Sequence, residues 1–389
     1  MLTIKRKLQQ DEIIRLAQTD EQWCVTIYLP TFRNGHKRKE NPVRLKSAVH
    51  ATKQELEARG VEPGLFQSLW RECQALTEDT VFWNEVEDGL ALLSTPAGTK
   101  IFLTSEKFDE DIVVDHRFDL VPLLRIVQSG LHFYLLALDQ NRTRLFAGTR
   151  HELTPVDTGG LPSARDRMLS GEVFEKERMR GRSLPGMQGV SPGTFHGRGP
   201  RVDAEEKDML RYLREVDTRV YELLHDSHRP LLVAGTAQVV GLYRQANTYP
   251  YLSADTIPHD PHGNDLHRLH KEAVARLEAQ ARVRLERAVH RYLSVRGRLG
   301  REGAAEELEK IVPAALAGKI DTLLLHEGVH VWGAITNGNG ELELHDRPGP
   351  EDHEILSLLV AHTLRHRGQF RVLAPSQLPQ SPVAAVLRK

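Results

Sequence analysis

The sequence predicts an α/β protein, and three observations lead to that fold class. Strand-like apolar runs alternate with helix-like segments along the chain, which is typical of sheets covered by helices. With 389 residues the chain is longer than one ordinary core allows, so its length indicates two to three domains. A hydrophobic content of 40% and a charged content of 27% are typical of a globular protein rather than a disordered one.

The first block of the chain, 1–124, begins with a short helix and a strand. Pro42 stands in the first turn of a second helix, and Pro96 and Gly98 separate two short strands into a hairpin. The elements expected here are helices over 11–18 and 42–59 and strands over 23–30, 90–94 and 100–104.

The second block, 125–262, opens with a hairpin over 131–149, and a long stretch with few helix or strand signals follows over 157–201. So long a connection inside a compact domain is usually functional or disordered. Asp203 is the expected N-cap of the next helix. The remaining elements expected in this block are a helix over 204–226, a strand over 230–235 and a helix over 236–246.

The third block, 263–389, begins with a helix over 266–297. Its apolar side chains recur at every fourth position, at Leu269, Ala273, Leu277, Ala281, Leu285, Val289 and Leu293. The elements expected after it are a helix near 304–317, a strand pair within 319–335, a strand over 341–345, a helix over 351–367 and a strand over 369–374.

Composition excludes several classes of protein. Cys24 and Cys73 are isolated, with neither a metal-binding nor a redox spacing, which fits a reducing compartment. The charged N-terminus has no signal-peptide core, and no apolar run approaches the ~20 residues of a membrane span. We therefore expect a cytoplasmic protein. Its net charge of -1 decides nothing about partners, because local basic runs are offset by acidic stretches elsewhere.

HEGVH, residues 326–330, has the formal spacing of a zinc-peptidase motif, with Glu351 or Glu354 as a downstream carboxylate. That chemistry needs both histidines on one face of a helix. Here the motif follows an apolar run and contains Gly328, so we expect a β-hairpin instead. A zinc metallopeptidase remains a remote alternative.

A second histidine-rich segment is more simply a solvated connection between domains, and we expect no metal and no cofactor in the protein. This segment contains His259, His262, His267 and His270.

GVSPG, residues 189–193, matches the G-x-S-x-G spacing of serine hydrolases. In those enzymes the backbone N–H after the serine helps to form the oxyanion hole. Pro192 follows Ser191 here and has no N–H, and no strand precedes the motif. The sequence therefore argues against a serine nucleophile.

Two basic segments remain as binding candidates. The first lies between a strand and a helix and contains Arg33, His36, Lys37, Arg38, Lys39, Arg44 and Lys46. The second flanks the glycine-rich loop and contains Arg178, Arg180, Arg182, His196, Arg198 and Arg201. A run of charges is usually a solvated face, but basic residues beside glycines let the backbone approach phosphates. Two such loops are consistent with binding a large RNA.

Five motifs in order along the chain carry a family resemblance. They are VTIYLPTFRNG…NPVRLK (25–46), FYLLALDQNRTRLFAG (133–148), FHGRG (195–199), AGTAQVVGLYRQANTYPYL (234–252) and KIDTLLLHEGVHVWG (319–333). Together they resemble the bacterial archaeo-eukaryotic release factor family, the bacterial relatives of the archaeal and eukaryotic class-one release factors and of Pelota. The resemblance spans essentially the whole chain.

The resemblance implies three domains and a place of action. Residues 1–124 would face the decoding region, residues 125–262 would form an RNase H-like middle domain with the loop over 157–201, and residues 263–389 would form an α/β/α domain that is similar to RNA-binding ribosomal proteins and contacts RNA or a GTPase. The implied partner is the ribosome, through the rRNA of its A site, with a translational GTPase such as elongation factor Tu. Neither a membrane nor DNA is expected as a partner, and off the ribosome we expect a monomer.

The chain departs from release factors at their catalytic loop, where a Gly-Gly-Gln sequence helps water to attack the peptidyl ester. Gly160 is followed by Leu161, and Gln188 is preceded by Met187, so the sequence contains no Gly-Gly-Gln. The resemblance therefore favours a Pelota-like rescue or hibernation factor that occupies the A site of stalled or idle ribosomes without peptide hydrolysis. Gln188 and the two basic segments would contact rRNA. The alternative is a release factor that hydrolyses peptidyl-tRNA with Gln188.

Overall fold

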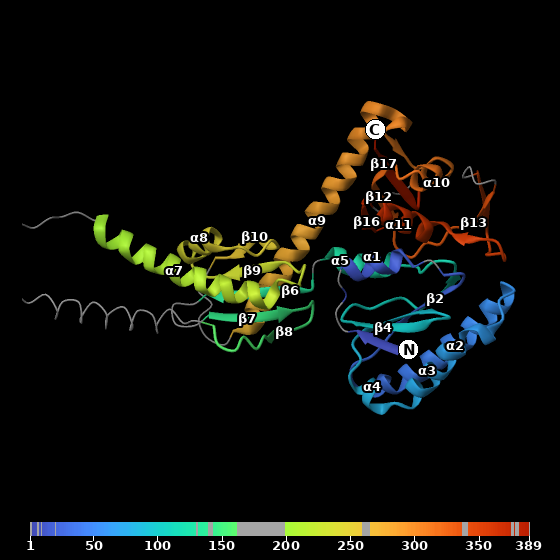
Figure 1. The fold of residues 1–389 in the computed structure, drawn as a ribbon, viewed down its shortest axis with the longest axis horizontal. Helices are drawn as coiled ribbons and strands as arrows, with labels where there is room; N and C mark the ends of the chain where they lie inside the picture. Colours follow the sequence, from blue (N-terminus) through green and yellow to red (C-terminus); the bar gives the residue numbers. More distant parts are fainter. Residues whose placement is uncertain are drawn as a thin grey trace, which may run out of the picture. The chain divides into compact units, whose positions relative to one another are not determined.

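The computed structural model describes residues 2–5, 8, 10–19, 21–129, 131–138, 143–161, 199–258, 265–336, 341–374, 377 and 381–388. The chain forms two compact units, one made of Met1–Ser129 with Ala279–Lys389 and the other of Gly130–Glu278. Sheets covered by helices build both units, which confirms the α/β class (Figure 1). The division into domains over 1–124, 125–262 and 263–389 stays a prediction.

The first unit contains a five-stranded sheet in the order β1-β4-β3-β2-β5, in which β1 runs parallel to β4 and the other neighbours are antiparallel. The side chains of β2 alternate between two cores, with Val25, Ile27 and Leu29 in one core and Cys24 and Tyr28 in the other. The strand bounds are β1 Leu2–Lys5, β2 Cys24–Pro30, β3 Gly89–Thr95, β4 Gly98–Thr104 and β5 Asp111–Asp115.

Helices cover both faces of this sheet. α2 and α3 supply Leu45, Leu56 and Leu69 to the core of Val25, and α1 and α5 supply Ile13 and Leu124 to the other core. The predicted helix over 42–59 and the hairpin over 90–104 are confirmed, whereas the sequence analysis missed α3, α4 and α5. The helix bounds are α1 Gln10–Ala17, α2 Asn41–Ala58, α3 Gln67–Glu78, α4 Thr80–Asn84 and α5 Val121–Ser129.

A four-stranded sheet in the order β11-β17-β12-β16 forms the other part of the first unit. Leu324 packs in a core with Tyr292 of α9, whereas Leu323 and Leu325 pack with α10 and α11, so helices lie on both faces as the α/β/α prediction requires. The bounds are β11 Ala304–Ala305, β12 Ile320–His326, β16 Gln369–Leu373, β17 Val383–Leu387, α9 Leu266–Leu299, α10 Leu308–Leu316 and α11 Ile355–Arg365.

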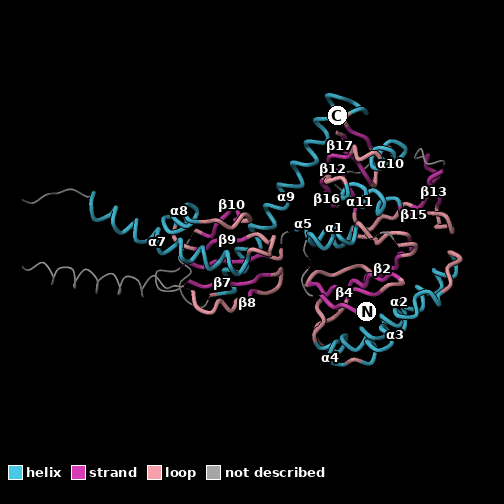
Figure 2. The backbone as a smooth tube through the Cα atoms, viewed as in Figure 1, coloured by secondary structure: helices cyan, strands magenta, loops and turns pink. Residues whose placement is uncertain are grey.

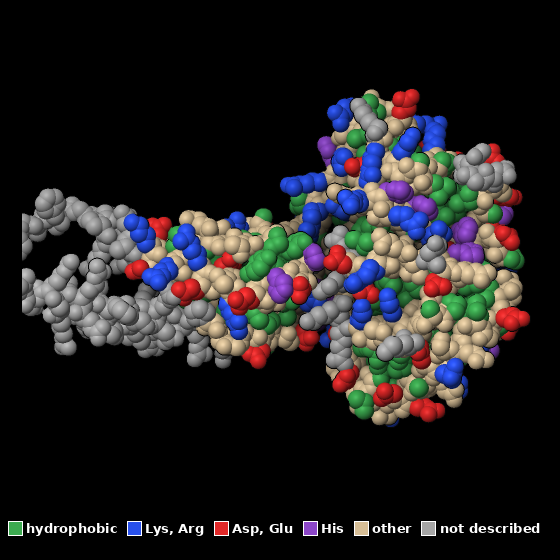
Figure 3. Space-filling model, in the orientation of Figure 1, with side chains coloured by type: hydrophobic (Ala, Val, Ile, Leu, Met, Phe, Trp, Pro, Cys, Tyr) green, Lys and Arg blue, Asp and Glu red, His purple; other side chains and the backbone are tan. Residues whose placement is uncertain are grey.

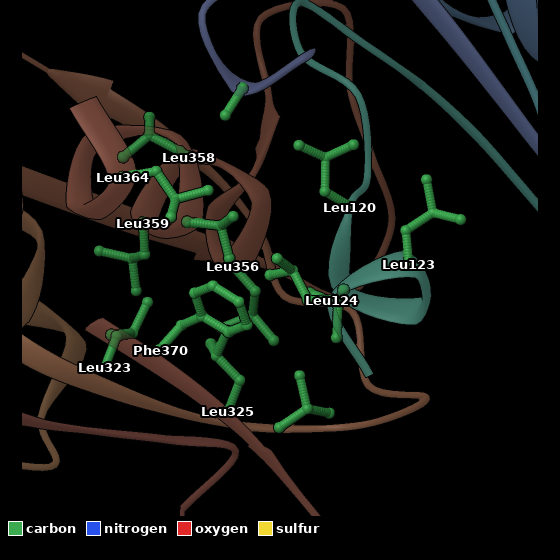
Figure 4. Close-up of a cluster of buried hydrophobic side chains, with 14 of the residues drawn as sticks. Leu120, Leu123, Leu124, Leu323, Leu325, Leu356, Leu358, Leu359, Leu364 and Phe370 are labelled. Carbon is green, nitrogen blue, oxygen red and sulfur yellow. The ribbon is translucent and has the colours of Figure 1, made fainter. Parts of the chain in front are cut away.

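The two parts of this unit share one apolar core. Figure 4 shows Leu124 of α5 close to Leu356 of α11 and Phe370 of β16, with Leu123 farther from them on the same helix, and all four residues belong to one buried cluster. Burying aliphatic side chains contributes ~1.5–3 kcal/mol each. The core therefore holds sequence segments together that are more than 200 residues apart, as the hydrogen bond from Gln128 to the Val372 carbonyl oxygen across 244 residues also does.

The predicted hairpin within 319–335 is wrong. β12 pairs with β16 and β17, whereas the next strand, β13, belongs to a separate three-stranded sheet in the order β14-β13-β15. The two strands are therefore successive along the chain but are not hydrogen-bonded to each other. The bounds are β13 Trp332–Thr336, β14 Glu341–His345 and β15 His353–Glu354.

The second unit contains a five-stranded sheet in the order β10-β9-β6-β7-β8. β6, β7 and β8 are antiparallel neighbours, and β9 and β10 run parallel to β6 and to each other. Figure 2 shows the strands of this sheet, in magenta, grouped with the helices α7 and α8. This order and these directions are those of the RNase H-like sheet expected for the middle domain. The bounds are β6 Phe133–Leu138, β7 Thr143–Gly148, β8 Leu153–Pro155, β9 Leu231–Ala234 and β10 Leu252–Ile257.

Both faces of this sheet are covered, which explains why β6 and β9 are apolar at every position. α7 and α8 pack on the face of Leu136 and Val233, and the first part of α9 packs on the face of Leu135. α7 spans Gly199–Leu224 and α8 spans Ala237–Ala246. Asp203 lies inside α7, so its prediction as the N-cap is wrong.

No helix of the described residues is long and apolar enough to cross a membrane. Cys24 and Cys73 are buried and free, and burial raises the pKa of the Cys73 thiol to about 12. Neither thiol is therefore poised to react as a thiolate.

Candidate functional site

The basic segment after β2 is held by one buried amide. The side chain of Asn41, the first residue of α2, accepts a hydrogen bond from the Phe32 N–H at 3.0 Å and donates one to the Phe32 carbonyl oxygen at 3.0 Å. Between these residues the chain forms a short 3-10 helix over His36–Glu40. Gly35 precedes it with a φ of 80°, a conformation that glycine adopts without strain. The segment is therefore an ordered projection from the first unit.

Three arginines of this segment contact neighbouring side chains. Arg33 lies 3.1 Å from Asp88 and 3.6 Å from Glu87, and Arg44 lies 3.4 Å from Glu40 and 3.5 Å from Glu110. Arg38 donates a hydrogen bond to the side-chain oxygen of Asn84. Ion pairs of this kind reduce the charge that an arginine offers to a polyanion. Arg33 and Arg44 thus stabilise the segment, whereas Arg38, bound to a neutral amide, keeps its charge.

The remaining basic residues are exposed. His36, Lys37, Lys39 and Lys46 face solvent, and Lys37 lies 5.5 Å from the centre of the Phe32 ring. In the part of the chain that the structure describes, none of the three lysines forms an ion pair. Lysine ammonium groups are compact, solvated charges that bind phosphates without a fixed geometry. This exposed set, His36, Lys37, Lys39 and Lys46, is hereafter the lysine edge.

The second basic segment falls outside the described residues. This holds for Arg178, Arg180, Arg182, Gln188, His196 and Arg198, and also for the GVSPG motif. Arg201 lies in α7, but its side chain is not described. His259 and His262 are likewise outside, whereas His270 of α9 contacts the Thr149 carbonyl oxygen at 2.9 Å. The structure therefore brings together the first basic segment only.

HEGVH does not have the geometry of a zinc peptidase. His326 is the last residue of β12 and is buried, Gly328 adopts a φ of 71°, and His330 follows in an extended segment. The helix that would put both histidines on one face is absent from these residues. His330 instead donates a hydrogen bond to Asp111 at 2.8 Å. The strand and turn predicted from the sequence are confirmed here.

His330 belongs to a network of charged groups that the sequence analysis missed. Burial lowers the pKa of His330, but the hydrogen bond to Asp111 and the charges of Asp111, Asp119 and Glu354 outweigh burial and raise it to about 9. Burial, together with the charge of Glu354, raises the pKa of Asp119 to about 7. The network is therefore a buried carboxylate cluster neutralised by a protonated imidazole. The only sequence signal was the set of aspartates at 111, 115 and 119, two of which begin and end the strand β5.

A cavity of about 680 Å³ in the same unit is lined by three histidines. Figure 3 shows histidine side chains reaching the surface of this unit next to lysines and arginines. Burial lowers the pKa of His116, and burial with the nearby Arg117 charge lowers the pKa of His362 to about 4. These imidazoles are therefore neutral at neutral pH. The lining residues are Glu21, Gln22, His116, Arg117, Leu316, Ile335, His353, Leu358 and His362.

Solved structures similar to the chain include translation factors. Dom34 of S. cerevisiae, a translation termination-like factor, is 12% identical, with 77% of this chain and 72% of that chain covered and a TM-score of 0.38. An archaeal Pelota, in a model of its ribosome-bound form with ABCE1, is 10% identical over 99% and 95%, with a TM-score of 0.38. The archaeal translation termination factor aRF1 is 14% identical over 98% and 99%, with a TM-score of 0.24.

No curated protein matches the sequence. One family model does, and it covers residues 132–319, from the first strand of the second unit to the residue before β12. The family is the bacterial archaeo-eukaryotic release factor family 3. The resemblance predicted from the motifs is thus confirmed over residues 132–319, which match the model of this family.

Proposed function

We propose that this protein binds the A site of stalled or idle ribosomes as a rescue or hibernation factor. The observation that carries the proposal is the family match over 132–319, because release factors work on the ribosome. The lysine edge supports it from a different part of the chain, since exposed cations on an ordered projection suit the phosphates of rRNA. The proposed role is cytoplasmic and needs no cofactor.

We propose further that the protein contacts a translational GTPase such as elongation factor Tu and that it hydrolyses no peptidyl-tRNA. The second part rests on the sequence, because Met187 stands where a Gly-Gly-Gln would have its second glycine. A side chain at that position fills space through which the backbone would approach the ester. Gln188, Arg178, Arg180, Arg182, His196, Arg198 and Arg201 stay proposed rRNA contacts.

Co-sedimentation with ribosomes tests the binding. A variant with Lys37, Lys39 and Lys46 changed to Ala removes three exposed charges and is expected to pellet with ribosomes at least ~10-fold less at moderate salt. The matched control changes Lys107, Lys271 and Lys310, three exposed lysines outside the segment, and is expected to pellet like the wild type. Equal pelleting of the two variants would remove the lysine edge from the proposal. Failure of the wild type to pellet, in extracts of growing and of starved cells, would remove the ribosome.

A peptide-release assay tests the absence of hydrolysis. Ribosomes carrying a labelled formyl-peptidyl-tRNA in the P site are incubated with the protein, and the expected release does not exceed that of ribosomes alone. Release that disappears in the Gln188→Ala variant would instead establish the alternative, a peptidyl-tRNA hydrolase that uses Gln188.

A further inference from the structure

Three metal-ligating side chains meet at the histidine-lined cavity, from two distant parts of the sequence. Asp115 is the last residue of β5, His116 follows it, and His353 begins β15. One ligand atom from each of the three residues lies within 4.8 Å of the others. Two imidazoles and one carboxylate are a common ligand set for zinc and for other divalent transition metals, whereas calcium and magnesium prefer oxygen alone.

The spacing of Asp115 and His353 fits two ligands of one ion better than a hydrogen-bonded pair. Asp115 Oδ1 lies 3.4 Å from His353 Nδ1. Two ligands that each lie about 2.1 Å from a tetrahedral ion are about 3.4 Å apart. For comparison, His345 Nδ1 lies 2.9 Å and 3.0 Å from the two oxygens of Asp352, the ordinary distance of a closed pair.

The other contacts of these side chains fix them in place. His116 Nδ1 donates a hydrogen bond to the Gln22 carbonyl oxygen at 2.5 Å, so the imidazole keeps a lone pair on Nε2. Its ring stacks on Trp23 with 4.4 Å between ring centres. Asp115 is fully buried and accepts a hydrogen bond from the Glu354 N–H at 3.0 Å through Oδ2, which leaves Oδ1 for an ion. Such second contacts are typical of residues that bind metals.

The cavity provides access for solvent. His362 lines it too, but its ring nitrogens are not among the ligand atoms that lie within 4.8 Å of one another, so the fourth ligand would be water that enters through the open cavity. Arg117 in the same lining opposes a bare cation, which favours an ion bound by nitrogen over one held by charge alone.

A rival cluster, formed by Asp111, Asp119 and His330, is less suited to an ion. His330 there is already occupied by its 2.8 Å hydrogen bond to Asp111, and an ion would have to displace the proton that neutralises the carboxylates. In the cluster of Asp115, His116 and His353, the distance between Asp115 and His353 is longer, at 3.4 Å, and His116 keeps a lone pair on Nε2 because its Nδ1 donates to the Gln22 carbonyl oxygen.

We propose that Asp115, His116 and His353 bind one divalent transition-metal ion of the zinc type, with water as the fourth ligand. The ion connects β5 with β15, which are more than 200 residues apart in the sequence, and so strengthens the first unit. The role is structural, and it goes beyond ribosome binding and does not depend on it.

The test is a metal titration of the full chain after removal of metal with a chelator. Cobalt(II) is the probe, because its visible absorption reports nitrogen and oxygen ligands, and zinc(II) is then added to displace it. We expect saturation at about one ion per chain, and an upward shift of the thermal unfolding midpoint with zinc but not with magnesium.

Substitutions of the proposed ligands test whether the ion binds at this cluster. His116→Gln and His353→Gln keep the side-chain volume and are expected to weaken binding ~10-fold or more. The control His50→Ala removes an exposed histidine of α2 and is expected to bind like the wild type. Folding of each metal-free variant is verified by its unfolding midpoint, and Asp115→Asn serves if a histidine variant fails to fold. The proposal is overturned by the absence of saturable binding, or by binding that survives in His353→Gln and is lost in His330→Gln.

Discussion

Arg59 directly follows α2, yet only 2% of its surface is exposed. Its Nη1 donates a hydrogen bond to the Asp352 carbonyl oxygen at 3.2 Å, and its guanidinium lies 4.6 Å from the centre of the Trp332 ring. Its Nε lies 3.5 Å from Glu55. A buried charge persists only with such partners. Arg59 therefore connects the end of α2 with the sheet that contains β13 and β15.

Removal of the Arg59 side chain is expected to destabilise the first unit strongly. Arg59→Ala leaves the Asp352 carbonyl oxygen and Trp332 without their partner, and an unsatisfied buried acceptor alone lowers the free energy of unfolding by ~1–3 kcal/mol, to which the lost packing adds. Arg71→Ala on the exposed face of α3 is the control, with a change within ~0.5 kcal/mol. Urea unfolding of both variants measures the difference. Equal stabilities would show that the Arg59 contacts contribute nothing.

The pKa of His330 predicts a pH dependence of stability. Because folding raises this pKa from 6.5 to about 9, the stabilisation by protonated His330 is complete below pH 6.5 and is lost as pH rises toward 9. The free energy of unfolding is thus expected to fall between these values. In His330→Gln the decline is expected to be smaller, and chemical unfolding at a series of pH values measures it. An equally steep decline in this variant would assign the effect to another group.

What the sequence could predict at this scale depends on how local each signal is. The lysine edge was predictable because its residues are consecutive or nearly so, and a basic run can be read directly. Arg59 and His330 were not predictable as buried charges, because their partners lie 293 and 219 residues away. The ion pairs of Arg33 with Glu87 and Asp88, and of Arg44 with Glu110, were not predictable either, because each joins residues more than 50 positions apart.

At the scale of elements, α9 shows which buried residues of a helix can be predicted from the spacing of its apolar side chains. Its apolar side chains at every fourth residue predict one continuous stripe, but a helix advances 3.6 residues per turn, so a spacing of four drifts by about 40° per step. Leu269, Ala273 and Leu277 are buried as predicted, whereas Leu293 is 55% exposed and Tyr292 is buried in its place. Because of this drift, the helix contributes buried side chains to one core near its start and to another core further along.

The pairing of strands was the second feature that the sequence could not predict. The strands within 319–335 were expected to form a hairpin because only a turn separates them, but β12 finds its partners in β16 and β17 near the end of the chain. Apolar positions on both faces of β12 permit either pairing, and only the long-range contacts of its neighbours decide between them.

Gly148 of β7 gives a prediction for one strand pair. A Cβ there would lie 2.3 Å from the Phe133 ring of the neighbouring strand, so Gly148→Ala is expected to lower the free energy of unfolding by ~1–3 kcal/mol. The matched control is Gly241→Ala inside α8, where nothing lies within 4 Å of the new Cβ and helix propensity predicts a gain of ~0.5–1 kcal/mol. Opposite shifts of the thermal midpoint are expected, and shifts of the same sign would contradict the packing described for this sheet.

At the scale of the whole molecule, the chain is nearly neutral, and its positive charge is concentrated in short segments. The net charge of -1 gives no general attraction to RNA, so binding has to come from defined edges such as that of Lys37, Lys39 and Lys46. The family match spans residues 132–319, and the lysine edge lies outside that range, so the proposed ribosome binding has support from two separate stretches of the sequence. Residues 162–198 of the glycine-rich loop predicted over 157–201 lie outside the described residues, so the part of this loop in binding stays a proposal.

The salt dependence of ribosome binding tests the central claim most directly. The affinity of the purified protein for purified ribosomes is measured at a series of salt concentrations, for the wild type and for the variant with Lys37, Lys39 and Lys46 changed to Ala. Each phosphate contact contributes about 0.7–0.9 to the slope of log affinity against log salt, so the variant slope is expected to be shallower by ~2–3. A wild-type affinity that does not change with salt, or no saturable binding at all, would contradict the account.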